Sequence, residues 1–172
     1  MSIKGLDSLL RKLSVLDDVV LDGAQNGFTK SLLKVQRDAK RHAPRSSSDL
    51  ANSIHTRVDK GEKSISGSVY TNNPHAMYVE FGTGPKGKGT AAIIPKGVVL
   101  QYRDTPWFVN AKDFPDYIKY KFVTYEVDGE TYILVRGQKA QQFMSPAAKM
   151  NKSKFSGEVS KGIRKSLRGM SR

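Results

Sequence analysis

Cysteine is absent from this 172-residue sequence, and histidine is scarce. The absence of cysteine excludes disulfides, thiol catalysis and the common zinc-binding frameworks. The three histidines, His42, His55 and His75, are too widely spaced to suggest a metal site. We therefore expect neither a metal nor any other cofactor.

Long apolar segments are missing as well. No run approaches the roughly 18 residues that a membrane-spanning helix needs. The N-terminus has no basic segment followed by an uninterrupted hydrophobic stretch, which argues against secretion. We expect a protein of the cytoplasm, or of a particle assembled there, without a membrane partner.

Acidic residues are few relative to basic ones. The sequence has 29 Lys and Arg against 16 Asp and Glu, which gives a formal net charge of +13. Such an excess attracts polyanions and makes like-charged copies repel one another. Nucleic acid is the obvious class of partner, and a ring of subunits through which DNA passes would explain the same charge.

The length fits one domain over residues 1–172, with room for a sizeable insertion. Hydrophobic residues make up 38% of the sequence, which is below the usual share of about 45–50%. The core is therefore small, and partner subunits are expected to supply part of the stability.

Helical periodicity dominates the first third of the sequence. Apolar residues at three- and four-residue steps predict a short helix over residues 3–13 and a longer one over about 16–42. Gly23 and Gly27 predict a kink or break in the longer helix. Pro44 ends it.

Alternating residues predict two β-hairpins. The first joins residues 54–59 to 64–70. The second joins 122–127 to 130–135 through Asp128-Gly129, a pair that suits a tight type I′ turn. Four aromatic residues are expected to pack beneath or beside this second hairpin: Trp107, Phe108, Phe114 and Tyr117.

A C-terminal helix is predicted to start at Ser145-Pro146, because a capping residue precedes a proline in the first turn. Its apolar edge repeats every fourth residue, at Phe155, Val159, Ile163 and Leu167. The simplest interpretation of the segment before it places Phe143 and Met144 in the core.

Residues 82–90 match the start of a phosphate-binding loop. Gly89, however, stands where Ser or Thr must reach magnesium, and no helix is predicted to follow. A mobile surface loop is the better interpretation.

Glu80 is the one acidic residue of its neighbourhood, and acid–base catalysis on glycosides would need a second positioned carboxylate. We expect Glu80 to accept hydrogen bonds from backbone groups or to pair with a basic side chain. Gly82 and Gly84 would supply backbone conformations that a β-carbon forbids. His75 is expected to be a surface or capping residue, and Ser46–Ser48 have no partners for catalysis, so we expect no enzyme.

Two sets of basic residues recur at helical spacing. They are Lys30, Lys34, Arg37 and Arg41 in the long helix, and Lys161, Arg164, Lys165 and Arg168 in the C-terminal helix. A solvated helix face is the simplest interpretation, and contact with DNA phosphate or with an acidic neighbouring subunit is the alternative. No helix-turn-helix or zinc-finger spacing is present, so sequence-specific reading of DNA is not expected.

Two short segments, taken with the order of the features around them, carry a family resemblance. They are Glu80-Phe81-Gly82-Thr83-Gly84 and Phe143-Met144-Ser145-Pro146-Ala147. A long helix, Ala43-Pro44, residues 49–54 and a hairpin precede them, and a basic helix follows. This order resembles the neck or tail-completion (head–tail joining) proteins of long-tailed bacteriophages. The resemblance covers about residues 1–84 and 138–168, and Ser47-Ser48 replace the family's Thr-Gly. The stretch at about residues 85–137 is longer than compact members of the family need, so the resemblance implies a β-rich insertion there.

The resemblance implies an α+β fold. A small antiparallel β-sheet would pack against a long N-terminal helix and a C-terminal helix, with an inserted β-hairpin. It also implies a structural protein of the virion neck or tail, in which copies form a ring between the capsid connector or head-completion protein and the tail-terminator or tail-tube protein. Genomic DNA would pass through with nonspecific phosphate contact. The alternative hypothesis is a nonspecific nucleic-acid-binding protein that acts free in the cytoplasm.

Overall fold

A computed structural model describes residues 10–11, 13–44 and 48–170, and the chain forms two compact units. One unit joins residues 1–72 to residues 146–172, and the other comprises residues 73–145. Most of the predicted 3–13 helix lies outside the described residues.

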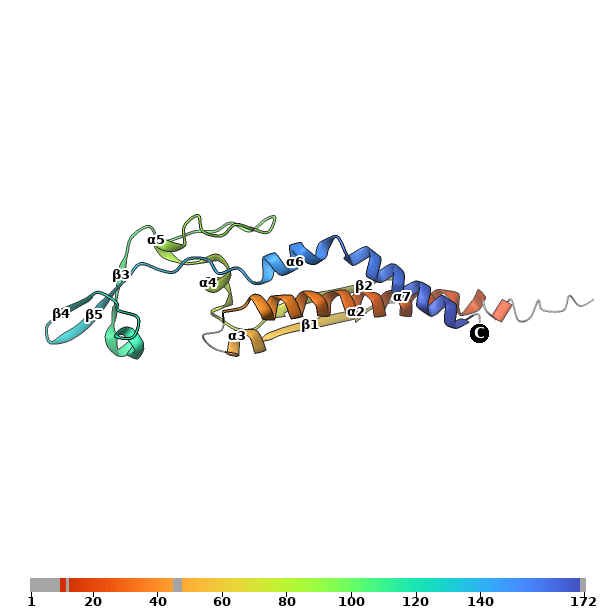
Figure 1. The fold of residues 1–172 in the computed structure, drawn as a ribbon, viewed down its shortest axis with the longest axis horizontal. Helices are drawn as coiled ribbons and strands as arrows, with labels where there is room; N and C mark the ends of the chain where they lie inside the picture. The colour runs from red at the N-terminus through yellow and green to blue at the C-terminus, as the bar shows by residue number, and fades with distance from the viewer. Residues whose placement is uncertain (1–9, 12, 45–47, 171–172) are drawn as a thin grey trace, which may run out of the picture. The chain divides into compact units, whose positions relative to one another are not determined.

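Helix α2 (Leu16–His42) is the longest element of the first unit and is continuous (Figure 1). The predicted break at Gly23 and Gly27 is wrong, because both glycines face helix α7 (Phe155–Met170). A β-carbon would lie 2.7 Å from Cα of Ile163 at Gly23 and 2.6 Å from Cα of Val159 at Gly27. Close packing of the two helices therefore offsets the low helix propensity of glycine.

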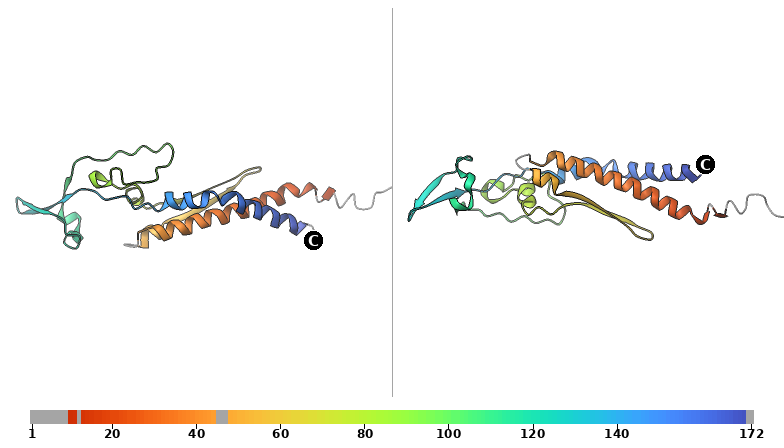
Figure 2. Two further views of the ribbon diagram at one scale, coloured as in Figure 1. Left: turned by 45° about the horizontal axis from the view of Figure 1, so that its top comes forward. Right: turned by 90° about the horizontal axis from the view of Figure 1, so that it is seen from below.

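A short helix α3 (Ser48–Asn52) leads into the first hairpin, β1 (Ile54–Lys60) and β2 (Ile65–Thr71). Figure 2 shows this hairpin along α2. Ile54 is fully buried, and the side chain of Gln36 in α2 donates to the Ile54 carbonyl at 2.7 Å. The same amide accepts a hydrogen bond from the Thr56 hydroxyl at 3.1 Å, so one helix residue fixes the position of the strand.

The predicted C-terminal helix is two helices, α6 (Met144–Lys152) and α7. The buried Asn151, near the end of α6, donates to the Asp38 carboxylate of α2 at 2.8 Å and to the Ala147 carbonyl at 2.9 Å. After the break, Phe155 packs edge-on against Phe28 with ring centroids 5.0 Å apart. The interruption lets both helices contact α2 through different residues.

The second unit contains two short helices, two single-turn 3₁₀ helices and a three-stranded sheet. These elements are α4 (Ala76–Phe81), α5 (Gly84–Gly87), β3 (Trp107–Asn110), η1 (Ala111–Asp113), η2 (Pro115–Tyr117), β4 (Thr124–Val127) and β5 (Glu130–Val135). The sheet is antiparallel in the order β3-β5-β4. Asp128 and Gly129 both have positive φ, 52° and 76°, which confirms the predicted turn.

Trp107 and Phe108 lie beside the hairpin, which is one of the two predicted positions, and they do so as part of a strand that was not predicted, since residues 107–110 pair with β5. Four residues are too few to give a clear alternating signal. The mixed α+β class is confirmed: a long N-terminal helix, small antiparallel sheets and a C-terminal helix are all present.

Candidate functional site

Glu80 connects the two short segments that carry the family resemblance, residues 80–84 and 143–147. Its carboxylate is buried, with 5% of the residue exposed. One oxygen accepts hydrogen bonds from the amides of Phe143 and Met144 at 2.8 and 2.9 Å, and the other accepts from Ser145 at 2.8 Å. These amides form the start of α6, where helical N–H groups have no carbonyl partner. Glu80, rather than Ser145, therefore caps this helix, with its negative charge at the favourable end of the helix dipole.

The backbone turns sharply at Gly82 and Gly84, next to Phe81 and Thr83, and we call residues 82–84 the glycine corner. Gly82 and Gly84 have φ of 79° and 59°, as their predicted role requires. A β-carbon on Gly82 would lie 2.8 Å from the Gln138 carbonyl, and one on Gly84 would lie 2.7 Å from the Trp107 ring. Only glycine allows the backbone to pass this close.

The prediction of a mobile loop over residues 82–90 is wrong. Gly82, Gly84 and Gly87 are buried, and residues 84–87 form α5. Thr83 exchanges backbone hydrogen bonds with Gln138 at 2.9 and 3.1 Å, and the Lys86 amide donates to Arg136 at 3.0 Å. Both ends of the 85–137 segment are thus fixed to each other. No local sequence pattern indicates this pairing, because Thr83 and Gln138 are 55 residues apart.

Lys88 and His75, two residues considered above for chemical roles, make other contacts in the structure. Lys88, which a phosphate loop would aim at its ligand, pairs instead with Asp104 at 2.6 Å. His75 is exposed and precedes α4, where its carbonyl accepts from the Val79 amide. Among the residues that the structure describes, no three His, Asp or Glu side chains could hold a metal ion. None of the described helices has the length and apolar character needed to cross a bilayer.

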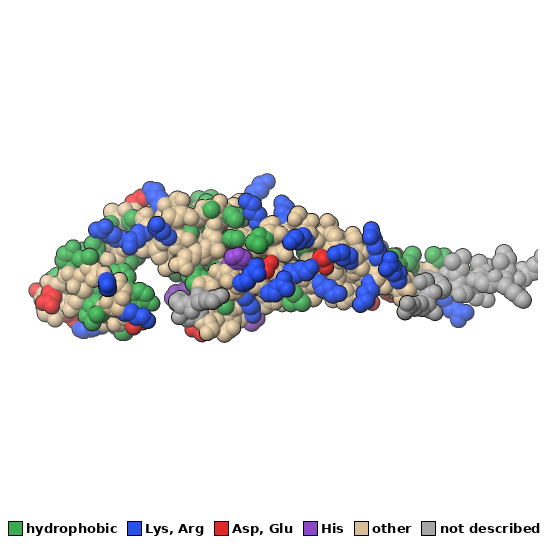
Figure 3. Space-filling view, in the orientation of Figure 1, with side chains coloured by type: hydrophobic (Ala, Val, Ile, Leu, Met, Phe, Trp, Pro, Cys, Tyr) green, Lys and Arg blue, Asp and Glu red, His purple; other side chains and the backbone are tan. Residues whose placement is uncertain are grey.

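The positive charge is unevenly distributed between the two units. The unit of residues 1–72 and 146–172 has 20 of the 29 basic residues and 9 of the 16 acidic ones, a net charge of +11. The unit of residues 73–145 has a net charge of +2. Figure 3 shows Lys and Arg side chains gathered over α2, α6 and α7. Any electrostatic attraction of a polyanion is therefore concentrated on the first unit.

The basic stripe of α2 is partly neutralised by the protein itself. Lys34 pairs with Glu158 of α7 at 3.1 Å, while Arg37 and Arg41 lie 3.8 and 3.5 Å from Asp38. The hydrogen bond from Asn151, together with the two arginines, lowers the pKa of Asp38. Lys30 is exposed on the same helix. Two of the four side chains, Arg37 and Arg41, nevertheless keep more than 60% of their surface exposed and remain able to reach a phosphate.

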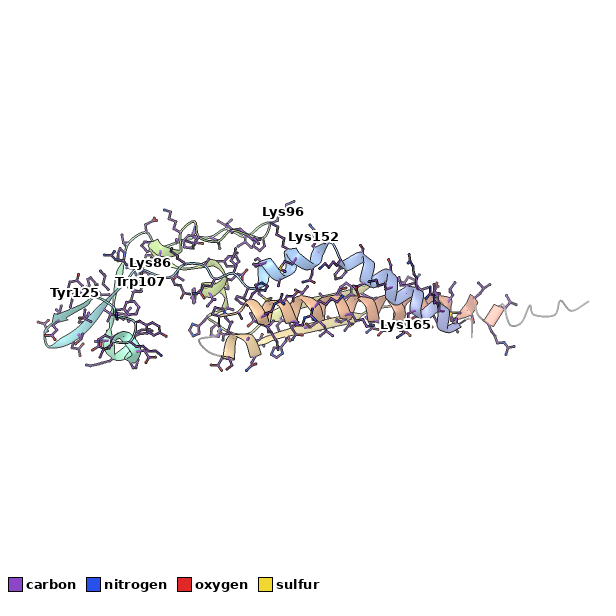
Figure 4. All side chains as sticks on the ribbon, viewed as in Figure 1. Lys86, Lys96, Trp107, Tyr125, Lys152 and Lys165 are labelled. Atoms are coloured by element: carbon purple, nitrogen blue, oxygen red, sulfur yellow. The ribbon has the colours of Figure 1, made fainter. Side chains whose placement is uncertain are left out.

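The basic stripe of α7 is the more open of the two. Lys161, Arg164, Lys165 and Arg168 line one shallow surface hollow. Lys161 pairs with Glu158 at 3.2 Å, and Lys34 and Lys161 together hold the pKa of that carboxyl below its usual value. Figure 4 labels Lys165 in α7 and Lys152 in α6. The structure thus groups this predicted set on one helix face, away from the glycine contact with α2.

The remaining residues that carry the resemblance are buried or half-buried around the start of α6. Phe143 and Ala147 are fully buried, Met144 and Pro146 are half-buried, and all four belong to α6 or directly precede it. Sequence reasoning missed Asp38 and Asn151. A buried acid and amide 113 residues apart leave no local pattern that could have indicated their contact.

Comparison with known proteins identifies one family. Residues 7–82 match the family HK97-gp10_like, described as "Bacteriophage HK97-gp10, putative tail-component". Neither the curated proteins nor the solved structures contain a match to this chain. The matched residues cover α2, the first hairpin, α4 and the start of the glycine corner. Over residues 7–82, a little under half of its length, the chain is therefore similar to the HK97-gp10-like family, which is described as a putative phage tail component.

Proposed function

We propose that this protein is a structural component of the head–tail junction of a long-tailed phage. Copies form a ring that joins the capsid connector to the tail and lets the genomic DNA pass. The observation that carries the proposal is the family match over residues 7–82. The resemblance of the Phe143–Ala147 segment to head–tail joining proteins supports the finer assignment to the neck.

The mechanism is geometric rather than chemical. Closed cyclic symmetry needs head-to-tail contacts between copies, with one surface toward the head-completion protein and another toward the tail-terminator or tail-tube protein. Glu80 and the glycine corner hold distant segments of the 73–145 unit together, through hydrogen bonds to backbone amides and close backbone contacts. Residues 85–137 form an insertion, specific to this particle, within a single head–tail joining domain.

The basic face has a use in this proposal. Phosphate contacts carry no sequence information, so DNA can slide past them. The +11 charge of the first unit supports such contact at its α2 and α7 stripes. The same charge favours the second candidate, a nonspecific nucleic-acid-binding protein that acts free in the cytoplasm.

Deletion of the gene separates the two candidates. Under the proposal, lysates contain filled heads and finished tails that do not join, and gold-labelled antibody against the protein marks the neck of wild-type particles. Normal particle yield after deletion, with the protein spread along cellular DNA, would contradict the neck assignment.

A further inference from the structure

One face of the β3-β5-β4 sheet carries a cluster of exposed apolar residues, and the polar side chains of Asn110 and Glu130 lie at the edge of this cluster. Residues that are paired across antiparallel strands point to the same side of a sheet. Phe108 pairs with Leu134, and Tyr125 pairs with Tyr132, and the rings of Phe108 and Tyr125 stack edge-on with centroids 5.4 Å apart. These side chains therefore share one face of the sheet.

Two further apolar residues extend this aromatic face. The Val123 carbonyl accepts from the Leu134 amide, and Val127 pairs with Glu130, so both valines follow the alternation of Tyr125. The exposed fractions are 58% for Phe108, 57% for Val123, 45% for Tyr125 and 53% for Val127. We call these four residues the aromatic face, and Tyr125 is labelled in Figure 4.

The opposite face of the same sheet is the one that is packed. Ile133 is 1% exposed, and its cross-strand partners are Val109 and Thr124. Burial of Ile133 provides the core of this small sheet, so the aromatic face is not needed for that purpose. Its side chains expose an apolar area on the order of 300–400 Å², about half of what each partner contributes to a standard interface.

Charge indicates what covers this face. Copies that each carry +13 repel one another, and the repulsion is strongest between their first units, at +11 each. The unit that contains the aromatic face has a net charge of only +2. Two copies can therefore approach through this unit with the least electrostatic cost.

The edges of the sheet are also available. Among the described strands, β3 and β4 each have one hydrogen-bonded neighbour, and every residue of β4 is exposed. An exposed apolar edge strand readily accepts another chain. From the apolar face, the free edges and the low local charge, we propose that the aromatic face is a contact surface between copies of this protein. This inference rests on the proposed ring and assigns one of its contacts to the 85–137 segment.

The test uses neighbouring residues that project from opposite faces of β4. Tyr125→Glu places a charge in the aromatic face, and Thr124→Glu places the same charge on the other side of the same strand. We expect light scattering after size-exclusion chromatography to show self-association of the wild-type protein. Tyr125→Glu should weaken it about tenfold or more, while Thr124→Glu leaves it within about twofold.

Salt and crosslinking make the test independent of folding defects. An apolar contact persists in 1 M NaCl, because salt screens the repulsion between copies, whereas a charge-driven contact weakens. The chain has no cysteine, so Tyr125→Cys gives a single attachment point for a thiol-linked photo-crosslinker. Crosslinked copies from Tyr125→Cys and none from Thr124→Cys support the proposal.

Three outcomes would overturn the inference: a monomeric wild-type protein at every concentration, equal effects of the two Glu variants, or association that disappears in high salt. The proposed function fails separately. If the protein is absent from particles but Tyr125→Glu still separates its copies, the neck assignment is wrong and the contact surface stands.

Discussion

At the scale of single residues, two buried carboxylates organise the backbone. Glu80 satisfies three amides at the start of α6, and Asp38 holds Asn151 near its end. Buried polar groups without partners are costly, so each carboxylate and its donors depend on one another. Glu80 was predicted to accept backbone hydrogen bonds, but its partners could not be read from the sequence.

Removal of the Glu80 carboxylate should destabilise the protein. Glu80→Ala leaves three helix-start amides without an acceptor, and we expect a loss of about 3 kcal/mol in the free energy of unfolding. Urea denaturation followed by circular dichroism measures it. Glu62→Ala, at an exposed hairpin turn, is the control and should change stability by less than about 0.5 kcal/mol. Equal stability of the two variants would contradict the capping role.

Asp38 should make stability depend on acid pH. Its folded pKa is lowered, first by the Asn151 hydrogen bond and then by Arg41 and Arg37. A carboxyl with a lowered folded pKa contributes stability above its unfolded pKa, about 3.9, and loses it as pH falls through the folded pKa. Unfolding free energies measured from pH 6 to pH 2.5 should fall less steeply for Asn151→Ala than for wild type. Parallel curves would show that the Asn151 contact does not lower this pKa.

At the scale of elements, the α2–α7 pair depends on close backbone approach. Gly162 of α7 lies against α2, where a β-carbon would meet the Gly27 amide nitrogen at 2.8 Å. Gly157 of the same helix faces open space, with no atom within 4 Å of a β-carbon. Gly162 is thus needed for close packing of the two helices, whereas Gly157 takes no part in that packing, and only the tertiary structure distinguishes them.

Alanine substitution at these two glycines should have opposite effects. Gly162→Ala should lower stability by about 2 kcal/mol, because the helices must move apart. Gly157→Ala should raise it by up to about 1 kcal/mol through better helix propensity. Thermal unfolding monitored at 222 nm compares both with wild type. An increase in Tm for both variants would show that the helices are not in close contact.

At the scale of the whole molecule, the excess of positive charge and the similarity to the phage family lie mainly in the same unit. The basic excess lies in the unit that contains most of the matched residues, whereas the 73–145 unit is nearly neutral. The proposed division of roles follows from this: the first unit faces polyanions, and the aromatic face of the second contacts another copy.

Charge reversal on α7 should weaken DNA binding. Changing Lys161, Arg164, Lys165 and Arg168 to Glu should reduce the salt dependence of binding to duplex DNA by roughly 0.9 per lost phosphate contact. Fluorescence anisotropy at several salt concentrations measures this slope. The control reverses four exposed lysines of the other unit: Lys86, Lys96, Lys119 and Lys121. An equal decrease in the salt dependence of DNA binding for both variants would mean that the basic face of α7 is an ordinary solvated surface.

The sequence alone determined the long helix at about residues 16–42, a helix that begins near residue 145, the Asp128-Gly129 turn, the charge and the absence of thiols. These depend on composition or on neighbours within a few residues. Tertiary structure decided the cap at Glu80, the continuity of α2 through Gly23 and Gly27, and the break between α6 and α7. It also placed Trp107 and Phe108 in a third strand. Each of these depends on a contact between distant parts of the chain, where packing and buried hydrogen bonds outweigh local preference.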